Sequence, residues 1–314
     1  MKSWKLHISP AREFSYHARR VGGDAALSRN DDIMSRPHVE FVQAQSLPWR
    51  PATFAHLGAD VEVKVLSRDA ETGATTAILR IPTGWRQAGA FALSADEEFF
   101  VLDGALELDG QRYGLHCYGY LPAGYERGAA SSATGADILT FFSAEPSLCV
   151  RVRSASADVI PFLDAFEMPW HTDKMDPAYG ESGLCWKILR RDETARDVTM
   201  LVASRPHFHP PDWRGPQERH DCVEEMFLLS GDYIGDRGLM EAGAYFWRPP
   251  GLDHGPYGSR GGNLGLFRTL GADLANNWTD DRREIDRDAA RHEPIIADMA
   301  TRAKVLPWKS PPRY

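Results

Sequence analysis

The chain repeats itself at a spacing of 127 residues, and this repeat restricts its fold more than any other sequence feature. The segment 97–104, EEFFVLDG, corresponds to the segment 224–231, EEMFLLSG, and 127 is the difference between positions 97 and 224. Further matches follow in the same order, and they are Tyr118 with Tyr245, Pro122 with Pro249, Gly124 with Gly251, and Gly135 with Gly262. An ordered set of matches at one spacing indicates two copies of one unit, at roughly 40–150 and 160–275.

Each copy has the pattern of short β-strands. Residues 75–81 and 198–202 are apolar runs rich in β-branched residues, which are typical of strands. A Pro-x-Gly turn at 122–124 recurs at 249–251. Many short strands between such turns predict an all-β sandwich or barrel. Only residues 280–303 have a charged, alanine-containing helical pattern, which predicts a partly helical C-terminal tail.

Composition and charge exclude several classes of protein. The net charge of -8 argues against nucleic acid or an anionic membrane as a partner. No apolar run approaches the roughly 18 to 20 residues of a membrane helix. The four cysteines stand far apart without a CxxC pair, which favours a reducing cytoplasm. The polar opening stretch, residues 1–38, is expected to be a flexible or poorly structured extension.

The second copy carries the residues with the clearest chemistry. His220 is followed at short, defined spacings by Glu224 and Gly231, and a second segment runs from Gly243 through a Pro-x-Gly turn to His254. These spacings resemble the two motifs of the cupin superfamily, G(x)5HxH(x)3-4E(x)6G and G(x)5PxG(x)2H. Glu218 occupies the position of the first motif histidine, which is a departure from the family pattern. The segment 223–231 is also similar to ChrR-like cupins within the wider group of RmlC-like cupin domains.

The resemblance implies an all-β fold of two tandem cupin barrels, each a double-stranded β-helix or jelly roll. The expected division is an extension at 1–38, an N-terminal degenerate cupin at 39–155 and a C-terminal metal-binding cupin at 156–275. The partly helical tail would then occupy residues 276–314.

The spacing of the motif residues has a physical reason. His220 and Glu224 lie four residues apart, and even spacing along a strand sends side chains to the same face. His254 follows a Pro-Gly turn and would come from a neighbouring strand. Two imidazoles and one carboxylate suit a divalent first-row metal, with Fe(II) favoured and Zn, Mn or Ni left open. Glu218 lies two residues before His220, so its side chain would point to the same face of the strand, and it is a candidate fourth ligand. The alternative is a charged strand residue that is exposed to solvent.

The first copy has lost most of these ligands. The repeat spacing places Leu93 opposite His220 and Arg127 opposite His254, and Phe91 falls near the place of Glu218. Leucine has no donor atom and arginine stays protonated, so neither side chain binds a metal ion. Only Glu97 remains, and an ion pair between Arg127 and Glu97 is expected to replace the metal. The sequence therefore predicts one metal ion per chain.

Aromatic and imidazole side chains near the motifs are candidates for a substrate pocket. They are His207, His209, Trp213, Tyr245 and Trp247. The alternative for the two histidines is an ordinary loop at the pocket rim, and the alternative for the aromatic residues is the core of the barrel. No acid or base is identified as catalytic.

These features favour a metal-dependent enzyme, and the resemblance points to an Fe(II) dioxygenase that acts on a small carbonyl or phenolic compound. One alternative is a ChrR-like zinc-binding sensor, although the N-terminal stretch lacks the His/Cys cluster of such a regulator. Another alternative is a Zn- or Mn-dependent hydrolase, lyase or isomerase. The expected partners are a small-molecule substrate and further copies of the chain in a homo-oligomer.

Overall fold

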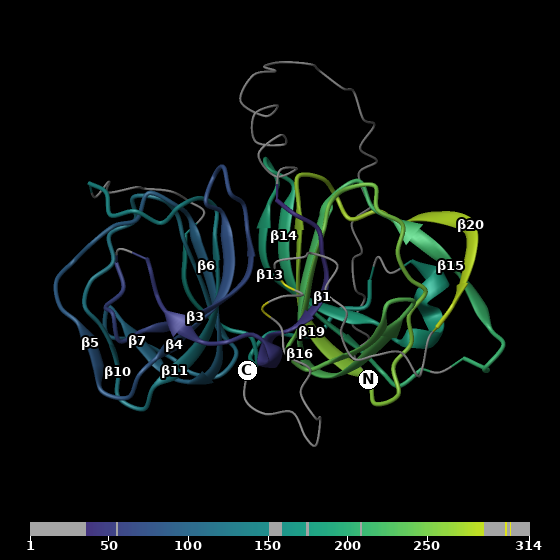
Figure 1. Ribbon diagram of the computed structural model, residues 1–314, viewed down its shortest axis with the longest axis horizontal. Coiled ribbons are helices and arrows are strands. Elements are labelled where there is room, and N and C mark those ends of the chain that lie inside the picture. The colour runs from purple at the N-terminus through teal and green to yellow at the C-terminus, as the bar shows by residue number, and fades with distance from the viewer. Residues whose placement is uncertain are drawn as a thin grey trace, which may run out of the picture.

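The computed structural model describes residues 36–54, 56–150, 159–173, 176–207 and 209–285, together with residues 299 and 302. This part of the chain is nearly all β-structure, arranged as two halves that lie side by side (Figure 1). Short 3-10 helices occur at Ala44–Ser46 (η1) and Pro177–Ser182 (η2). None of the helices described is long and apolar enough to cross a membrane.

The N-terminal half contains a seven-stranded sheet and a four-stranded sheet. The larger sheet has the order β12-β9-β6-β11-β4-β3-β2, and the smaller one has the order β5-β10-β7-β8. The strands are β2 (Arg50–Pro51), β3 (Glu62–Arg68), β4 (Thr75–Ile81), β5 (Trp85–Gln87), β6 (Glu97–Gly104), β7 (Leu106–Leu108), β8 (Gln111–Tyr113), β9 (Cys117–Leu121), β10 (Ala130–Ser132), β11 (Ala136–Phe142) and β12 (Ile160–Asp164).

The C-terminal half contains a second seven-stranded sheet and a two-stranded one. The larger sheet has the order β1-β18-β16-β19-β14-β13, with β17 paired to β16, and the smaller one joins β15 to β20. The strands are β1 (Val39–Gln43), β13 (Cys185–Asp192), β14 (Asp197–Ser204), β15 (Arg214–Arg219), β16 (Val223–Gly235), β17 (Gly238–Glu241), β18 (Ala244–Arg248), β19 (Asn263–Leu270) and β20 (Asn277–Glu284).

The sequence repeat corresponds to a repeat of strand pairing. The order β9-β6-β11-β4 in one half matches the order β18-β16-β19-β14 in the other. Each copy has a glycine at positive φ in its long strand, Gly104 at the end of β6 at 70° and Gly231 within β16 at 79°. A Cβ atom at Gly104 would lie 2.1 Å from the carbonyl oxygen of Gly135, and one at Gly231 would lie 2.0 Å from that of Gly262. Both positions therefore require glycine, which explains why these residues recur.

The two halves exchange their first strands. β1 begins the first sequence copy but pairs with β18 in the C-terminal sheet, where Figure 1 shows it in purple. β12 begins the second copy but pairs with β9 in the N-terminal sheet. Each of these strands therefore pairs across the predicted division at residues 39–155 and 156–275. No local sequence pattern indicates this exchange, because a strand can pair with any exposed sheet edge that its connecting segment reaches.

The halves pack against each other through apolar side chains of both large sheets. One continuous core cluster contains Phe100 and Leu139 from the N-terminal half and Phe227 and Leu266 from the C-terminal half. Met299, from the predicted tail, is buried in the same cluster. Burial of these side chains from both halves supplies the main attraction between them.

A buried ion network crosses the same interface. Arg268 donates from Nη2 to Glu98 Oε1 at 3.0 Å and from Nη1 to Glu225 Oε2 at 2.7 Å. Thr199 of the C-terminal half donates to Glu98 at 2.5 Å, and Thr76 of the N-terminal half donates to Glu225. The two glutamates are equivalent positions of the repeat, so each copy accepts a hydrogen bond from the other.

Two features of the predicted architecture differ from the structure. No sheet closes on itself within the described residues, so the prediction of two closed barrels is not confirmed. The start of the predicted helical tail, Asn277–Glu284, is strand β20, which pairs with β15 over Arg214–Arg219. Backbone pairing with β15 determines this strand, and that pairing is not visible in the charged local sequence. The remainder of the tail lies outside the described residues except for positions 299 and 302.

Candidate metal centre

Backbone pairing brings two of the predicted ligands together. The amide of Glu218, in β15, donates to the carbonyl oxygen of His254 at 2.9 Å, and the amide of His254 donates back to Glu218 at 3.0 Å. The carbonyl oxygen of His220, just beyond β15, accepts from the amide of Gly251 at 2.8 Å. The Pro-Gly turn of the second motif is thus fixed to the first motif by main-chain hydrogen bonds.

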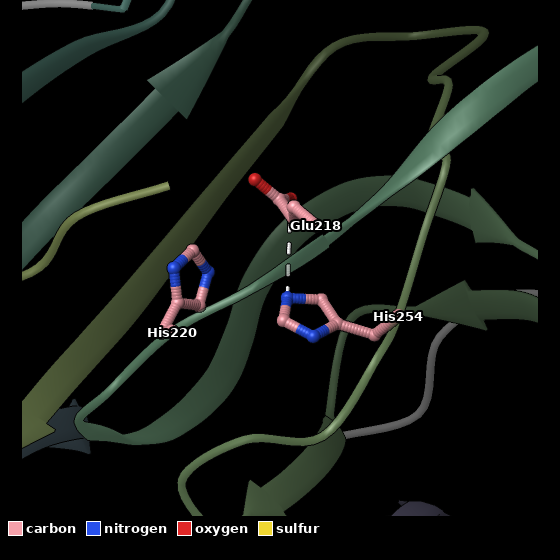
Figure 2. A group of neighbouring side chains, drawn as sticks. All are labelled: Glu218, His220 and His254. Atoms are coloured by element: carbon pink, nitrogen blue, oxygen red, sulfur yellow. Dashed lines mark ion pairs between the residues drawn. The ribbon is translucent and has the colours of Figure 1, made fainter. Parts of the chain in front are cut away.

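The side chains of Glu218, His220 and His254 converge on one point (Figure 2). One ligand atom from each of the three lies within 4.8 Å of the other two. All three residues are buried, with exposed fractions of 6%, 4% and 5%. A carboxylate and two imidazoles that meet away from solvent form a donor set that suits a divalent transition metal.

Main-chain carbonyl groups orient both imidazole rings. His220 Nδ1 lies 2.9 Å from the carbonyl oxygen of Ala275, and His254 Nδ1 lies 3.0 Å from that of Leu252. A carbonyl oxygen only accepts, so each Nδ1 carries the proton and each Nε2 keeps a free lone pair. His254 Nε2 is buried without a hydrogen-bond partner. A buried nitrogen of this kind is costly unless another group binds it, so the residues present fit a metal ion.

The electrostatics of the site favour the same protonation state. Burial, supported by the positive charge of Arg248, lowers the pKa of His254 to about 4, so the ring is neutral near pH 7. Burial raises the pKa of Glu218 to about 7 in the absence of a cation. A positive charge beside Glu218 would therefore relieve an unfavourable desolvation of its carboxylate.

Glu224 lies beside the three-residue group and also binds an arginine. Its Oε2 atom is 3.4 Å from His254 Nε2 and accepts from Arg248 Nη1 at 2.8 Å. Glu40, from the exchanged strand β1, accepts from the same guanidinium at 2.6 and 2.7 Å. Arg248 is 2% exposed, so this buried cation is balanced by two carboxylates. The predicted role of Glu224 as a ligand stays a prediction.

A cavity of about 480 Å³ opens beside the centre and includes Glu218 in its wall. Three predicted pocket residues, His207, His209 and Trp213, line it. The rings of His209 and Trp213 stack with their centroids 3.6 Å apart and an angle of 6° between their planes. The other aromatic lining residues are Tyr179, Tyr233, Tyr257 and Trp278.

The sequence matches the family model of DUF4437, a domain of unknown function, over residues 40–272. The chain belongs to this family. No curated protein matches the sequence.

Solved structures give this DUF4437 protein a known fold. A crystal structure from Nostoc punctiforme, of a protein provisionally named a dioxygenase, is 20% identical with a TM-score of 0.69. The match covers 87% of this chain and 99% of that one. The extent of this match shows a shared fold.

Two more distant likenesses do not bear on function. A Bacillus subtilis oxalate decarboxylase variant is 12% identical, with a TM-score of 0.47 and coverage of 76% and 78% of the two chains. Protein Ylba from E. coli is 13% identical, with a TM-score of 0.48 and coverage of 75% and 92%.

The other two predicted pocket residues lie elsewhere in the DUF4437 protein. Tyr245 is fully buried and donates to Glu225 at 2.6 Å, and Trp247 lines a separate cavity of about 320 Å³. Both belong to β18, where side chains alternate between faces, so they point to the interface between the halves. Arg248, one residue later, points to the metal centre. Strand alternation therefore separates these two side chains from the cavity beside Glu218.

Three important side chains of the site were not predicted, and they are Tyr179, Arg248 and Trp278. Tyr179 belongs to η2, and its hydroxyl donates to Glu218. Burial and the charge of Glu218 hold the pKa of Tyr179 far above its usual range, so the phenol stays a donor. A signal for η2 exists, since Asp176 before Pro177 is a helix-start pattern, but nothing local connects it to the motifs.

The equivalent centre of the N-terminal half has the same backbone and different chemistry. Phe91 and Arg127 form the same reciprocal main-chain pair as Glu218 and His254, with distances of 2.9 and 2.8 Å. Arg127 Nη2 lies 3.2 Å from Glu97 Oε2, which confirms the predicted ion pair. Arg127 is 2% exposed, so a guanidinium group stands where the other half has its imidazole.

Proposed function

We propose that this protein is a metal-dependent cupin dioxygenase that holds Fe(II) and acts on a small carbonyl or phenolic compound. The observation that carries the proposal is the convergence of two imidazoles and a carboxylate beside an aromatic cavity. Two histidines and one carboxylate are the ligand set of non-haem Fe(II) oxygenases, which leave coordination positions open. When bound, such an ion would supply a redox-active Lewis acid.

Glu218, His220 and His254 would hold the ion, with Glu224 as the candidate fourth ligand. The carbonyl oxygens of Leu252 and Ala275 keep the two rings in the tautomer that binds metals. Arg248 donates to Glu224 and offsets its negative charge. These residues orient the donors before a ligand binds, which reduces the cost of binding.

The cavity supports an uncharged, planar substrate. No lysine or arginine is among the described residues that line it, so nothing there would neutralise an anionic substrate. Its flat walls include Trp213, stacked on His209, and Tyr257, whose ring lies 4.4 Å from that of Tyr233. Aromatic walls of this kind bind flat apolar ligands and exclude water from the neighbouring centre.

The test begins with metal analysis of protein purified without oxygen. The apo-protein is then reconstituted with Fe(II) and offered β-diketones and hydroxyaryl ketones in an oxygen electrode, with His254→Ala as the matched control. Oxygen uptake that needs both substrate and His254 is the expected result. Tightly bound native Zn without Fe(II)-dependent uptake would contradict the proposal and favour a zinc-dependent hydrolase, lyase, isomerase or sensor.

A further inference from the structure

We infer that Tyr179 is a positioning residue for the metal centre, which holds one oxygen of Glu218 and leaves the other for the ion. This inference rests on the proposed metal centre but not on the reaction proposed for it. It assigns a role to a segment far from both sequence motifs.

The contact between the two side chains divides the oxygens of the carboxylate. The Tyr179 hydroxyl donates to Glu218 Oε2, whereas Oε1 faces His254 Nε2 at 3.9 Å. The Glu218 side chain is 8% exposed, so water does not compete freely for either oxygen. A neutral phenol donates only one hydrogen bond, so it occupies one oxygen and leaves the lone pairs of the other.

The η2 turn holds Tyr179 in place from its other side. Asp176 caps this turn, with Oδ1 accepting from the amide of Ala178 at 2.9 Å. Asp176 Oδ2 accepts from Trp278 Nε1 at 2.8 Å, and the indole meets the Tyr179 ring edge at a centroid distance of 5.4 Å. Ser182 donates to the carbonyl oxygen of Tyr179 at 2.6 Å. The phenol is therefore restrained by both its ring contact and its main chain.

These contacts form a closed circuit around the ligand. Trp278 in β20 is the cross-strand partner of Glu218 in β15. Glu218 pairs with Trp278 through the two strands, and the Trp278 indole donates to Asp176 in η2. Tyr179, in the same turn, donates back to Glu218. A side chain fixed at several points loses little further entropy when it binds, which is the physical advantage of such a support.

The N-terminal half has a residue at the equivalent place. A spacing of 123 residues aligns Lys64 in β3 with Lys187 in β13, and the same spacing places His56 opposite Tyr179. His56 is 8% exposed, and its ring centroid lies 6.1 Å from that of Phe91, the counterpart of Glu218. A side chain from this segment thus reaches the centre in both halves.

The role follows from how a carboxylate binds a cation. A free carboxylate can offer two oxygens to one ion, whereas a carboxylate with one oxygen engaged offers the other. Tyr179 would fix this choice and keep the cavity side of the centre accessible to substrate, since both Tyr179 and Glu218 line that cavity. Groups that orient metal ligands typically contribute about 10- to 100-fold to metal affinity.

The test compares Tyr179→Phe with the parent, using Co(II) as the probe. We expect the Co(II) affinity of the apo-protein, measured by chelator competition, to fall about tenfold, with a changed visible Co(II) spectrum. Tyr113→Phe is the matched control, because it removes a phenol hydroxyl that donates to the carbonyl oxygen of Pro161 in the N-terminal half, away from the metal centre. This control should retain the affinity and spectrum of the parent.

A double-mutant cycle decides whether Tyr179 acts through Glu218. The variant that combines Tyr179→Phe with Glu218→Gln should bind Co(II) no more weakly than Glu218→Gln alone. Equal affinity and an unchanged spectrum for Tyr179→Phe would overturn the inference, as would full additivity in the cycle. If the parent binds Co(II) but shows no oxygen uptake after reconstitution with Fe(II), the proposed reaction fails and the inference stands. If the parent binds no metal, both the proposed function and the inference fail. Equal unfolding temperatures of the apo-proteins confirm that the variants are folded.

Discussion

The two halves build the same backbone around two different centres. In the C-terminal half the paired positions are Glu218 and His254, and in the N-terminal half they are Phe91 and Arg127. The main-chain distances agree within 0.2 Å, being 2.9 and 3.0 Å in one case and 2.9 and 2.8 Å in the other. The fold therefore does not depend on metal ligands, because sheet hydrogen bonds and core packing maintain it in both halves.

The comparison also shows two ways to compensate one conserved carboxylate. Glu97 pairs with Arg127, at the histidine position itself. Glu224 pairs with Arg248, on the neighbouring strand β18, where the other half has Leu121. Moving the arginine away from the histidine position leaves space for a donor atom and keeps the buried charge balanced.

The largest difference between the halves should appear on removal of a histidine. We expect His254→Ala to lose tightly bound metal, with an affinity loss above about a hundredfold, because a first ligand contributes more than its supporting groups. Elemental analysis of the parent should give about one ion per chain. Two tightly bound ions per chain, or parent-like metal binding by His254→Ala, would contradict the asymmetry.

The corresponding change in the N-terminal half should affect stability and not metal binding. Arg127→Leu leaves Glu97 without its ion pair, and breaking a buried pair typically costs about 3–5 kcal/mol. Urea denaturation measures this loss, while metal content should stay at the parent value. Adding Glu97→Gln removes the uncompensated charge and should restore most of the stability; failure to do so would argue that Arg127 acts through other contacts.

A smaller effect on metal affinity should distinguish Glu218 from Glu224 in the C-terminal centre. Glu218→Gln retains an amide oxygen and should weaken Co(II) binding by roughly 10- to 100-fold, less than His254→Ala. The equivalent variant in the other half, Phe91→Leu, changes a position without a donor and should leave Co(II) binding unchanged. Unchanged affinity in Glu218→Gln would show that Glu224, and not Glu218, supplies the carboxylate ligand.

The smallest expected effect is a change of stability with pH, which arises from the ion pair between Glu40 and Arg248 in the C-terminal half. Burial alone would raise the pKa of Glu40, but the charge and hydrogen bonds of Arg248 overcome it and lower the pKa from 4.5 to about 2. The stabilisation from this pair is complete above pH 4.5 and is lost as the pH falls towards 2. Denaturation between pH 7 and 3 should show a stability difference between the parent and Glu40→Gln that shrinks below pH 4.5. A constant difference would contradict the assignment.

Much of the fold and part of the site could be predicted from local patterns. The repeat identified the matching strands, and motif spacing selected Glu218, His220 and His254, which the structure brings within 4.8 Å. Local spacing succeeds here because the ligands lie on two short segments that main-chain hydrogen bonds pair directly. The same reasoning failed for Tyr245 and Trp247, since it used distance along the chain without the alternation of side chains.

The sequence by itself determined a duplicated β-fold, one ligand-bearing half and one half with an arginine in place of a histidine. Only the tertiary structure decided that β1 and β12 change places, that Arg248 balances Glu224, and that Tyr179 reaches Glu218. The physical reason is the range of the interactions. Turns, parity and motif spacing are set by neighbours in the chain, whereas the choice of sheet edge and the contacts of η2 are made between residues 39 to 208 positions apart.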